Sequence, residues 1–390
     1  MLGALFLLFT FARQALGVEL GPDTEFDAAT AEAFAVNLGA SIAHDSNIFD
    51  TRVNEFESAI GTLRPSMLLA TAPSTRRFAL LYEGEYAHFF NDSSNDYDDH
   101  SLSGVARLKF GSRGRLDLAA ATAQGHRGRG NDQTGGLDPT SPLFPAQPDQ
   151  FDHHKWRARF RYGADGNRGR LRFEAGGDQR EHTNNFTRTR PFDYDTVFAS
   201  AGLSLQFHQR TAVVFDAVLT DIGFDTLAPN GASRDGRDWR FLVGLTWAAT
   251  AKTVGSVRVG VQERRFDNSA APDATNPSWE IDVRWSPRED SFVDFQTARI
   301  NQETFDEGTF IDNIESRIAW THTWRRDWQS VLRWSLSQMD FINGERNQDL
   351  TRLYVGVRKP QGRLLTWEAG YEWRSSDSDL DRSAFEGNMF

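Results

Sequence analysis

Apolar and polar side chains alternate along most of this chain, and the clearest example runs from Lys155 to Tyr162. There each odd-numbered side chain is cationic and each even-numbered one is apolar or aromatic. The alternation resumes over 168–175, after a break that contains Asp165 and Gly166. A period of two residues indicates a β-strand, because successive side chains of a strand point to opposite faces. Asp-Gly between two such runs indicates a tight β-hairpin.

Comparable runs recur from Ala33 onward and predict about eighteen strands, each near the roughly 9–11 residues of a tilted membrane strand. The runs are 34–42, 58–70, 77–89, 101–110, 115–124, 155–162, 168–179, 197–208, 211–220, 239–249, 255–262, 279–285, 292–300, 314–325, 328–339, 351–358, 364–374 and a poor one within 380–390. Very short connections alternate strictly with long polar ones rich in Asp, Asn, Gly and Pro. Short periplasmic turns and long extracellular loops alternate in this way in outer-membrane barrels.

Three strands carry Trp near both ends of their apolar face, as expected where aromatic rings meet lipid headgroups. The pairs are Trp239 and Trp247, Trp279 and Trp285, and Trp367 and Trp373. A soluble sandwich or propeller is the alternative, but neither a linker nor a change of composition divides 33–374. The predicted fold class is all-β, a transmembrane antiparallel up-and-down β-barrel in the outer membrane of a Gram-negative bacterium.

The composition limits the picture further. The 390 residues carry a formal net charge of −11 and include no Cys, which excludes thiolate sites and disulfides. Residues 2–11 form an apolar run that is too short for a membrane-spanning helix but suits a secretory signal. We therefore expect a signal peptide at 1–17, a periplasmic tail at 18–32 and the barrel at 33–390. No Lys or Arg precedes the apolar run, so either the start is misplaced or the sequence is trimmed.

In a lipid barrel the apolar face points outward, so the charged face lines the interior. The predicted channel-lining residues are Arg157, Arg159, Arg161, Arg170, Arg172, Glu174, Glu280, Asp282, Arg284, Arg317, Arg333, Glu368 and Glu372. We expect the members from 157 to 174 to form a basic wall that is short of acidic partners. The members from 280 to 372 should form a mixed, more acidic wall across the barrel. Either the two walls order charged solutes in transit, or the charges pair locally and only stiffen the barrel.

The hairpin register follows if Gly163 pairs with Arg168. Arg161 would then face Arg170, and Arg157 would face Glu174. The Pro-rich connection Arg127–Asp152 is too long for a plain turn. It either folds into the interior as a constriction or covers the outer mouth.

Other candidate sites are weak, and we predict no cofactor, no metal and no catalytic residue. His153 and His154 adjoin Asp152, but neighbouring His on a strand point to opposite faces. The spacing of Asp92, Asp96, Asp98 and Asp99 matches no calcium loop. No local signature joins a nucleophile to a base.

The entry segment Ile42–Phe49 ends in Asp45, Ser46 and Asn47, followed by an aliphatic and an aromatic residue. This segment is similar to the barrel entry of the family called putative beta-barrel porin 2, which is associated with polysaccharide synthesis and export in Gram-negative bacteria. The resemblance implies an outer-membrane channel, for example for an exopolysaccharide, and names no catalytic residue. Asp and Asn here also suit an Asx-type turn at the exit of a strand.

The C-terminus departs from the pattern of such barrels. Phe390 is a terminal aromatic, but it shares its face with Asn388 and Glu386, whereas Phe385, Gly387 and Met389 form the apolar face. Either the last strand continues beyond this chain, or the closure of the barrel is weak.

The predicted function is a channel, or porin, for hydrophilic solutes. The alternative is a non-conducting structural or adhesion barrel that binds a partner through its Asp-rich outer loops. An outer-membrane hydrolase is the third reading. The expected partners are outer-membrane lipid and lipopolysaccharide, a hydrophilic solute or polysaccharide, and periplasmic export components, without nucleic acid.

Overall fold

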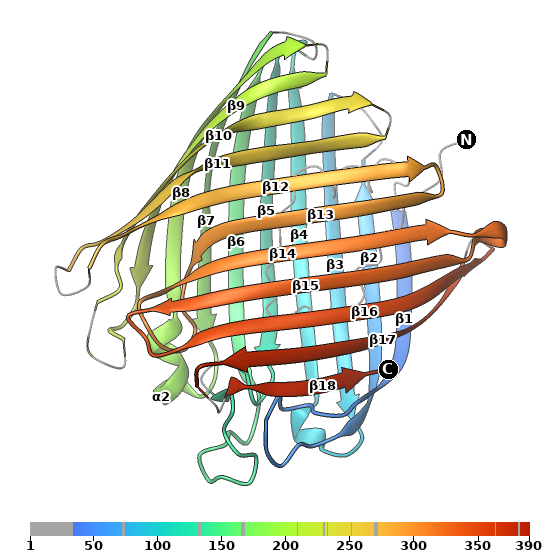
Figure 1. The fold of residues 1–390 in the computed structure, drawn as a ribbon, viewed down its shortest axis with the longest axis vertical. Helices are drawn as coiled ribbons and strands as arrows, with labels where there is room; N and C mark the ends of the chain where they lie inside the picture. The colour runs from blue at the N-terminus through green and yellow to red at the C-terminus, as the bar shows by residue number, and fades with distance from the viewer. Residues whose placement is uncertain are drawn as a thin grey trace.

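The structure, a computed structural model, forms one antiparallel sheet of eighteen strands closed into a barrel (Figure 1). It describes residues 34–390 apart from 72–74, 132–133, 165–167, 209, 229–230, 232, 251, 269–271, 363 and 381–382, and it leaves the side chains of 249 and 250 undescribed. The signal peptide and periplasmic tail expected within 1–32 lie outside the described residues.

The strands follow one another around the barrel in sequence order, each paired with its neighbours. They are β1 (Phe34–Asp45), β2 (Ser58–Ala70), β3 (Arg76–Phe89), β4 (Tyr97–Phe110), β5 (Gly114–Arg127), β6 (Asp149–Tyr162), β7 (Gly169–His182), β8 (Tyr194–His208), β9 (Thr211–Phe224), β10 (Gly236–Thr250), β11 (Thr253–Phe266), β12 (Ala274–Arg288), β13 (Ser291–Gln302), β14 (Phe310–Thr323), β15 (Gln329–Ile342), β16 (Asn347–Gln361), β17 (Leu365–Ser378) and β18 (Phe385–Met389). The predicted strands and the alternation of short and long connections are confirmed.

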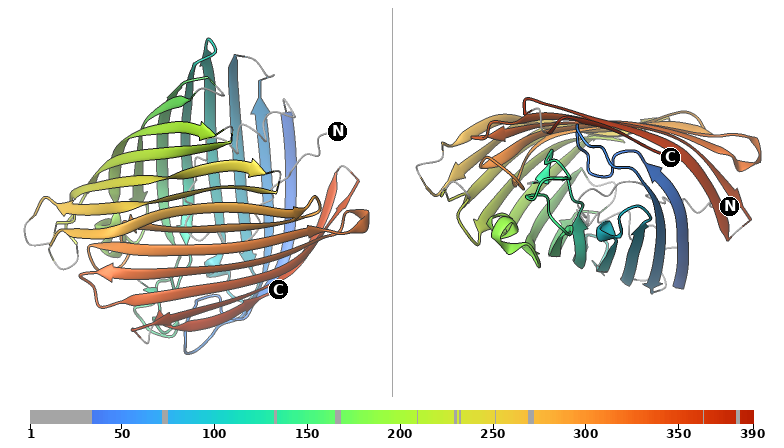
Figure 2. Two further views of the ribbon diagram at one scale, coloured as in Figure 1. Left: turned by 45° about the horizontal axis from the view of Figure 1, so that its top comes forward. Right: turned by 90° about the horizontal axis from the view of Figure 1, so that it is seen from below.

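Among the described residues, short helices lie in three connections: η1 (Ser93–Asn95), α2 (Phe186–Thr189) with η3 (Arg190–Phe192), and η4 (Arg325–Asp327). Among the described residues, none of the helices has the length and apolar character that a bilayer crossing requires. The right-hand view of Figure 2 shows the long connections gathered at one end, with α2 toward the inside of the curved wall.

The strands are longer than the alternation predicted, because pairing continues beyond the apolar positions toward the long loops. β6, for example, begins at Asp149 and β7 ends at His182. The connection between β5 and β6 is therefore 128–148, shorter than the predicted loop. The alternation itself is confirmed: large apolar side chains such as Trp156 and Phe173 are about half exposed on the outward face.

The predicted register of the hairpin β6–β7 is wrong by two residues. Tyr162 pairs with Leu171, Arg161 with Arg172 and Arg159 with Glu174. This register leaves one arginine pair directly opposed, Arg161 with Arg172, whereas the predicted one would have opposed two pairs, Arg161 with Arg170 and Arg159 with Arg172. Like charges directly opposite one another destabilise a sheet, so the observed register is electrostatically better.

The seam between the last strands and β1 is short. β18 has five residues, whereas β1 has twelve, and the only Cα pair recorded between them is Asp45 with Met389. Backbone hydrogen bonds also join His44 to Phe390 in both directions, at 2.8 and 3.1 Å. Contrary to the predicted face pattern, Gly387 faces inward. A Cβ at this position would lie 3.0 Å from Nε of the inward-facing Arg374. Phe390 is exposed on the outward face.

Candidate functional site: inner wall and outer mouth

A belt of ion pairs crosses the inner wall from β4 to β12. In this belt, defined here as the arginine belt, eight guanidinium groups share four carboxylates. The arginines are Arg107, Arg115, Arg157, Arg159, Arg161, Arg172, Arg240 and Arg258, and the carboxylates are Asp117, Glu174, Asp216 and Glu280. Since arginine is always charged at ordinary pH, the belt keeps a positive excess even though each of its members has an ionic partner.

Asp117 of β5 is the most buried of the shared carboxylates, with 5% of its side chain exposed. It accepts hydrogen bonds from the Nε atoms of Arg107 and Arg115 at 2.7 and 2.8 Å, and from Nη2 of Arg161 at 3.1 Å. One carboxylate therefore holds side chains from three strands. Charge-assisted bonds of this kind are stronger than bonds between neutral groups.

Glu174 and Asp216 continue the belt over the next strands. Glu174 accepts from Nε of Arg159 at 2.5 Å and lies 3.7 Å from Nη1 of Arg157. Asp216 of β9 reaches across β8 to Nη2 of Arg172 at 2.6 Å. Gly202 of β8 makes this reach possible, because a Cβ there would lie 2.7 Å from the Asp216 carboxylate.

The expected basic wall keeps more arginines than acids, although Asp117 and Asp216 pair with some of these arginines. One expectation about the charges is wrong. Glu280 does not belong to an opposite acidic wall. It ends the belt on β12, where it accepts from Nη1 of Arg240 at 2.5 Å and from Nη1 of Arg258 at 2.8 Å.

The remaining predicted wall residues form local pairs on the inward faces of β12–β17. Arg284 pairs with Asp294 at 2.6 Å, and Arg317 lies 3.3 Å from Glu315. Glu368 accepts from Arg358 and from the hydroxyl of Tyr354, both at 2.9 Å. The Arg333 guanidinium lies 4.4 Å from the Tyr354 ring, and Glu372 is 8% exposed. Asp282 and Arg170 lie on the inward faces of β12 and β7.

At the outer end, the first three long connections are packed together. Arg129 contacts the rings of Phe49 and Phe144, at 4.9 and 5.5 Å, and it also bonds to Asp92. Gly130 has a positive φ of 88°, and a Cβ there would lie 1.9 Å from the Phe49 carbonyl oxygen, so only glycine fits this approach. The connection 128–148 thus packs against its neighbours at the outer mouth.

The segment 303–309, between β13 and β14, reaches across the mouth. We call it the strap. On its own side Glu303 accepts from Nη2 of Arg264 at 2.8 Å. On the opposite side of the barrel, the Phe305 ring lies 5.2 Å from the guanidinium carbon of Arg127 at the end of β5. Because β5 and β13 are eight strands apart, this contact spans the mouth.

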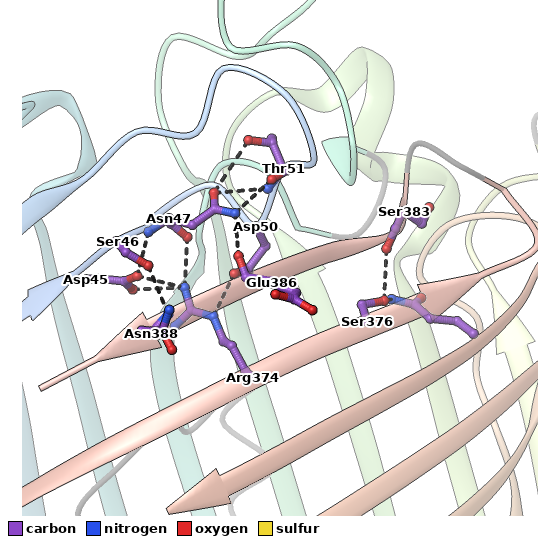
Figure 3. Close-up of polar contacts among 11 residues, drawn as sticks. Asp45, Ser46, Asn47, Asp50, Thr51, Arg374, Ser376, Ser383, Glu386 and Asn388 are labelled. Atoms are coloured by element: carbon purple, nitrogen blue, oxygen red, sulfur yellow. Dashed lines mark hydrogen bonds and ion pairs between the residues drawn. The ribbon is translucent and has the colours of Figure 1, made fainter.

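The entry motif singled out in the sequence closes the barrel. Arg374 of β17 donates to Asp45 at 2.9 Å, to Asp50 at 2.8 Å and to the carbonyl oxygen of Asn47 at 2.8 Å. Asn47, with no exposed surface, donates to the carbonyl of Glu386 at 2.8 Å. Figure 3 shows these side chains pointing toward one another at the seam. The backbone N–H of Asn47 also donates to Asp45 at 2.9 Å, which confirms the predicted Asx-type turn.

Several of these residues escaped the sequence reasoning. Asp117 and Asp216 were visible as acids on the polar face, but most of their partners lie on other strands. The strap gave no signal, because a short polar connection resembles any other loop. His153 and His154 do point to opposite faces, and His153 pairs with Asp178 at 2.6 Å.

The closed antiparallel wall, its exposed apolar outer face and its charged inner face define a porin-like β-barrel of the Gram-negative outer membrane. The chain belongs to the family described as Putative beta-barrel porin 2, whose model matches residues 34–390. The predicted resemblance is thus confirmed. No curated protein sequence matches the chain.

Solved structures share the fold at low sequence identity. The chain is similar to a BenF-like porin from Pseudomonas fluorescens Pf-5, with a TM-score of 0.50 and 9% identity over 92% of this chain and 97% of the porin. The chain is also similar to the outer membrane protein opdK from Pseudomonas aeruginosa, with a TM-score of 0.47 and 11% identity. This match covers 92% of this chain and 97% of opdK. The match to the siderophore receptor PirA from Pseudomonas aeruginosa has a TM-score of 0.43 and 11% identity, and it covers 90% of this chain. The chain spans 66% of the receptor, just under two thirds of its length.

Proposed function

We propose that this barrel is a passive channel for hydrophilic solutes and that its arginine belt favours anions. The observation that carries the proposal is the ratio of eight arginines to four carboxylates on one side of the inner wall. A fixed positive excess on a low-dielectric wall raises the local concentration of anions. The belt is anchored on strands, so it keeps its position while solutes pass.

The solute class that best fits such a wall is a polar molecule with carboxylate or phosphate groups, and an acidic exopolysaccharide is one example. Arginine forks match both groups through paired N–H donors. A passive channel needs neither a cofactor nor a catalytic residue, and the family and the fold favour a channel over an enzyme.

The test is the conductance of the purified protein in a planar bilayer under a salt gradient. Discrete conductance steps with a reversal potential on the anion side support the proposal. A folded, heat-modifiable barrel that gives no conductance, either unchanged or after disruption of the connection 303–309, contradicts it.

The second candidate is a non-conducting barrel that binds an external partner, and the packed outer mouth favours it. Arg129 joins two neighbouring loops through Asp92, and the strap contacts Arg127 at the end of β5 on the opposite wall. A barrel that stays silent in bilayers after disruption of the strap would support this second role.

A further inference from the structure

We propose that the strap, 303–309, is an internal gate that anionic solutes displace from the arginines of the outer mouth. The inference rests on the proposed channel function and adds to it a state and a ligand class. In the structure the strap contacts the opposite wall, and we take this arrangement as the closed state of the gate. Its carboxylates act as stand-ins for the anionic groups of a solute.

Cationic side chains hold the strap at its start and at its middle. Glu303 accepts two hydrogen bonds from Arg264, at 2.8 and 3.2 Å, and Arg264 is fully buried. Asp306 pairs with Nη1 of Arg346 at 2.8 Å. Thr304, between these anchors, is 2% exposed, so the strap is seated in the mouth rather than projecting into solvent.

Phe305 supplies the contact on the far side. Its ring packs against Arg127, and it also packs edge-on against Phe341, with 6.0 Å between ring centroids. A cation–π contact is individually weak, worth about 0.5–2 kcal/mol depending on its exposure. The contact of Phe305 with Arg127 is therefore weaker than the ion pairs that hold Glu303 and Asp306.

Beside the strap lie arginines whose polar atoms are incompletely bonded. Among the described residues, Nε and Nη1 of Arg234 and Nε of Arg180 have no hydrogen-bond partner, although these atoms are buried. Arg234 is 1% exposed and stacks on the ring of Phe224 at 4.0 Å, and Arg180 stacks on Phe151 at 4.6 Å. Tyr194 and Phe224 lie between the two guanidinium groups, with their ring centroids 6.1 Å apart.

The carboxylate of Glu303 interacts electrostatically with Arg234 but bonds to Arg264. Burial lowers the pKa of Arg234 to about 10, and the nearby carboxylates of Glu303 and Asp235 oppose this change. A buried guanidinium without full hydrogen bonding is costly, so a second anion at this place is favoured. A solute carboxylate or phosphate would supply the bonds that Glu303 leaves unmade and would compete with it for Arg264.

The experiment uses the absence of Cys from the chain. In the full-length protein, Thr304→Cys reports on the strap through its rate of reaction with a charged, membrane-impermeant thiol reagent. Leu143→Cys, at a position that is 78% exposed, reports on reagent access alone. The probes are inorganic phosphate, a galacturonate hexamer and the neutral maltohexaose, at constant ionic strength.

The proposal expects labelling at position 304 to become several-fold faster with phosphate or the galacturonate hexamer, with no change at position 143. Acceleration by phosphate alone would limit the gate to small anions, and acceleration by the hexamer alone would point to acidic saccharides. Equal acceleration by maltohexaose, or no acceleration by any probe, overturns the proposal.

A pair of variants separates the arginine's role from a loss of folding. In the Thr304→Cys background, Arg234→Gln should abolish the anion effect. Arg237→Gln, which removes an exposed outward-facing arginine paired with Asp221, should keep it. An unchanged effect in Arg234→Gln overturns the proposal, provided that both variants show the same heat-modifiable migration as the parent.

Conductance distinguishes failure of the gate from failure of the channel. Phe305→Ala frees the strap from the far wall and should raise the open probability. If the parent and this variant are both silent, the channel function fails. If both conduct equally and labelling ignores anions, the channel stands and the gate is overturned.

Discussion

Arg374 of β17 donates through Nη2 to the carboxylate of Asp45 in β1 at 2.9 Å, which joins two strands that are 329 positions apart in sequence. The carboxylate of Asp50 completes the grip at Nε. This contact compensates for the five-residue β18, because it ties β1 to a full-length strand across the short seam.

Replacing Arg374 should therefore weaken the closure of the barrel. Arg374→Gln leaves two buried carboxylates without their cation, and breaking a buried ion pair in this way costs about 3–5 kcal/mol. We expect a lower temperature for the shift in heat-modifiable electrophoresis. Arg317→Gln is the matched control, because its half-exposed pair with Glu315 contributes little. An equal shift temperature for the two variants would show that the contacts of Arg374 with Asp45 and Asp50 do not stabilise the closure of the barrel.

The arginine belt should set the ion selectivity. In a triple variant with Arg159, Arg161 and Arg172 each changed to Gln, the excess of positive charge falls by three, so the reversal potential under a salt gradient should move toward cations. The control replaces Arg237, Arg265 and Arg288 with Gln, because these arginines are outside the belt. An unchanged reversal potential in the belt variant would exclude the belt as the selectivity element.

Gly202 should not tolerate a side chain, because a side chain there would push apart the ion pair of Asp216 and Arg172. In Gly202→Ala the new Cβ would lie 2.7 Å from Asp216 and 3.2 Å from Nε of Arg172, so the pair must separate. We expect a loss of about 1–3 kcal/mol of stability and a shift in reversal potential. Gly104→Ala is the control, because its nearest neighbour would be 3.7 Å away. Wild-type stability and selectivity in Gly202→Ala would show that the pair adjusts freely.

The packing of the outer loops should depend on pH through Asp92. Burial alone would raise the pKa of Asp92, but hydrogen bonds from Ser94 and the charge of Arg129 hold it below the ordinary value. A depressed pKa means that the stabilisation is complete above the ordinary pKa of an aspartate, near 3.8, and is lost as the pH falls below it.

Limited proteolysis of 128–148 measures this dependence. Cleavage should increase between pH 5 and about pH 3, and Asp92→Asn should show the increased cleavage already at pH 7. The control is Asp98→Asn, which changes an exposed carboxylate at the start of β4. Cleavage that is independent of pH would exclude the Asp92 contact as the loop anchor.

The sequence predicted the wall better than it predicted the contacts on it. Period-two alternation follows from the chemistry of single strands, so Trp156 and Arg157 were assigned to opposite faces correctly. The contacts of Asp216 could not be found in this way, because its partners Arg172 and Arg258 depend on the register of five strands, β7 to β11. The two-residue error at β6–β7 shows that an error at one turn changes every pair of the hairpin. The predicted register placed Arg172 opposite Arg159, whereas the structure places Glu174 there.

The mouth was the least predictable part, since its contacts join segments with no common pattern. Arg127 and Phe305 are separated by about half of the barrel in sequence and meet because both stand at the outer end of the wall. The Asp45–Asn47 motif, by contrast, could be recognised early, but only the structure assigns it a closing role.

The sharing of carboxylates in the arginine belt gives the inner wall an unequal tolerance to sequence drift. Loss of one arginine leaves its acidic partner with another cation, as Asp117 keeps two after losing Arg161. Loss of Asp117 removes an ionic partner from three guanidinium groups at once. Over generations, the acidic positions of the belt should therefore change least, while its arginines exchange more freely and retune the channel in small steps.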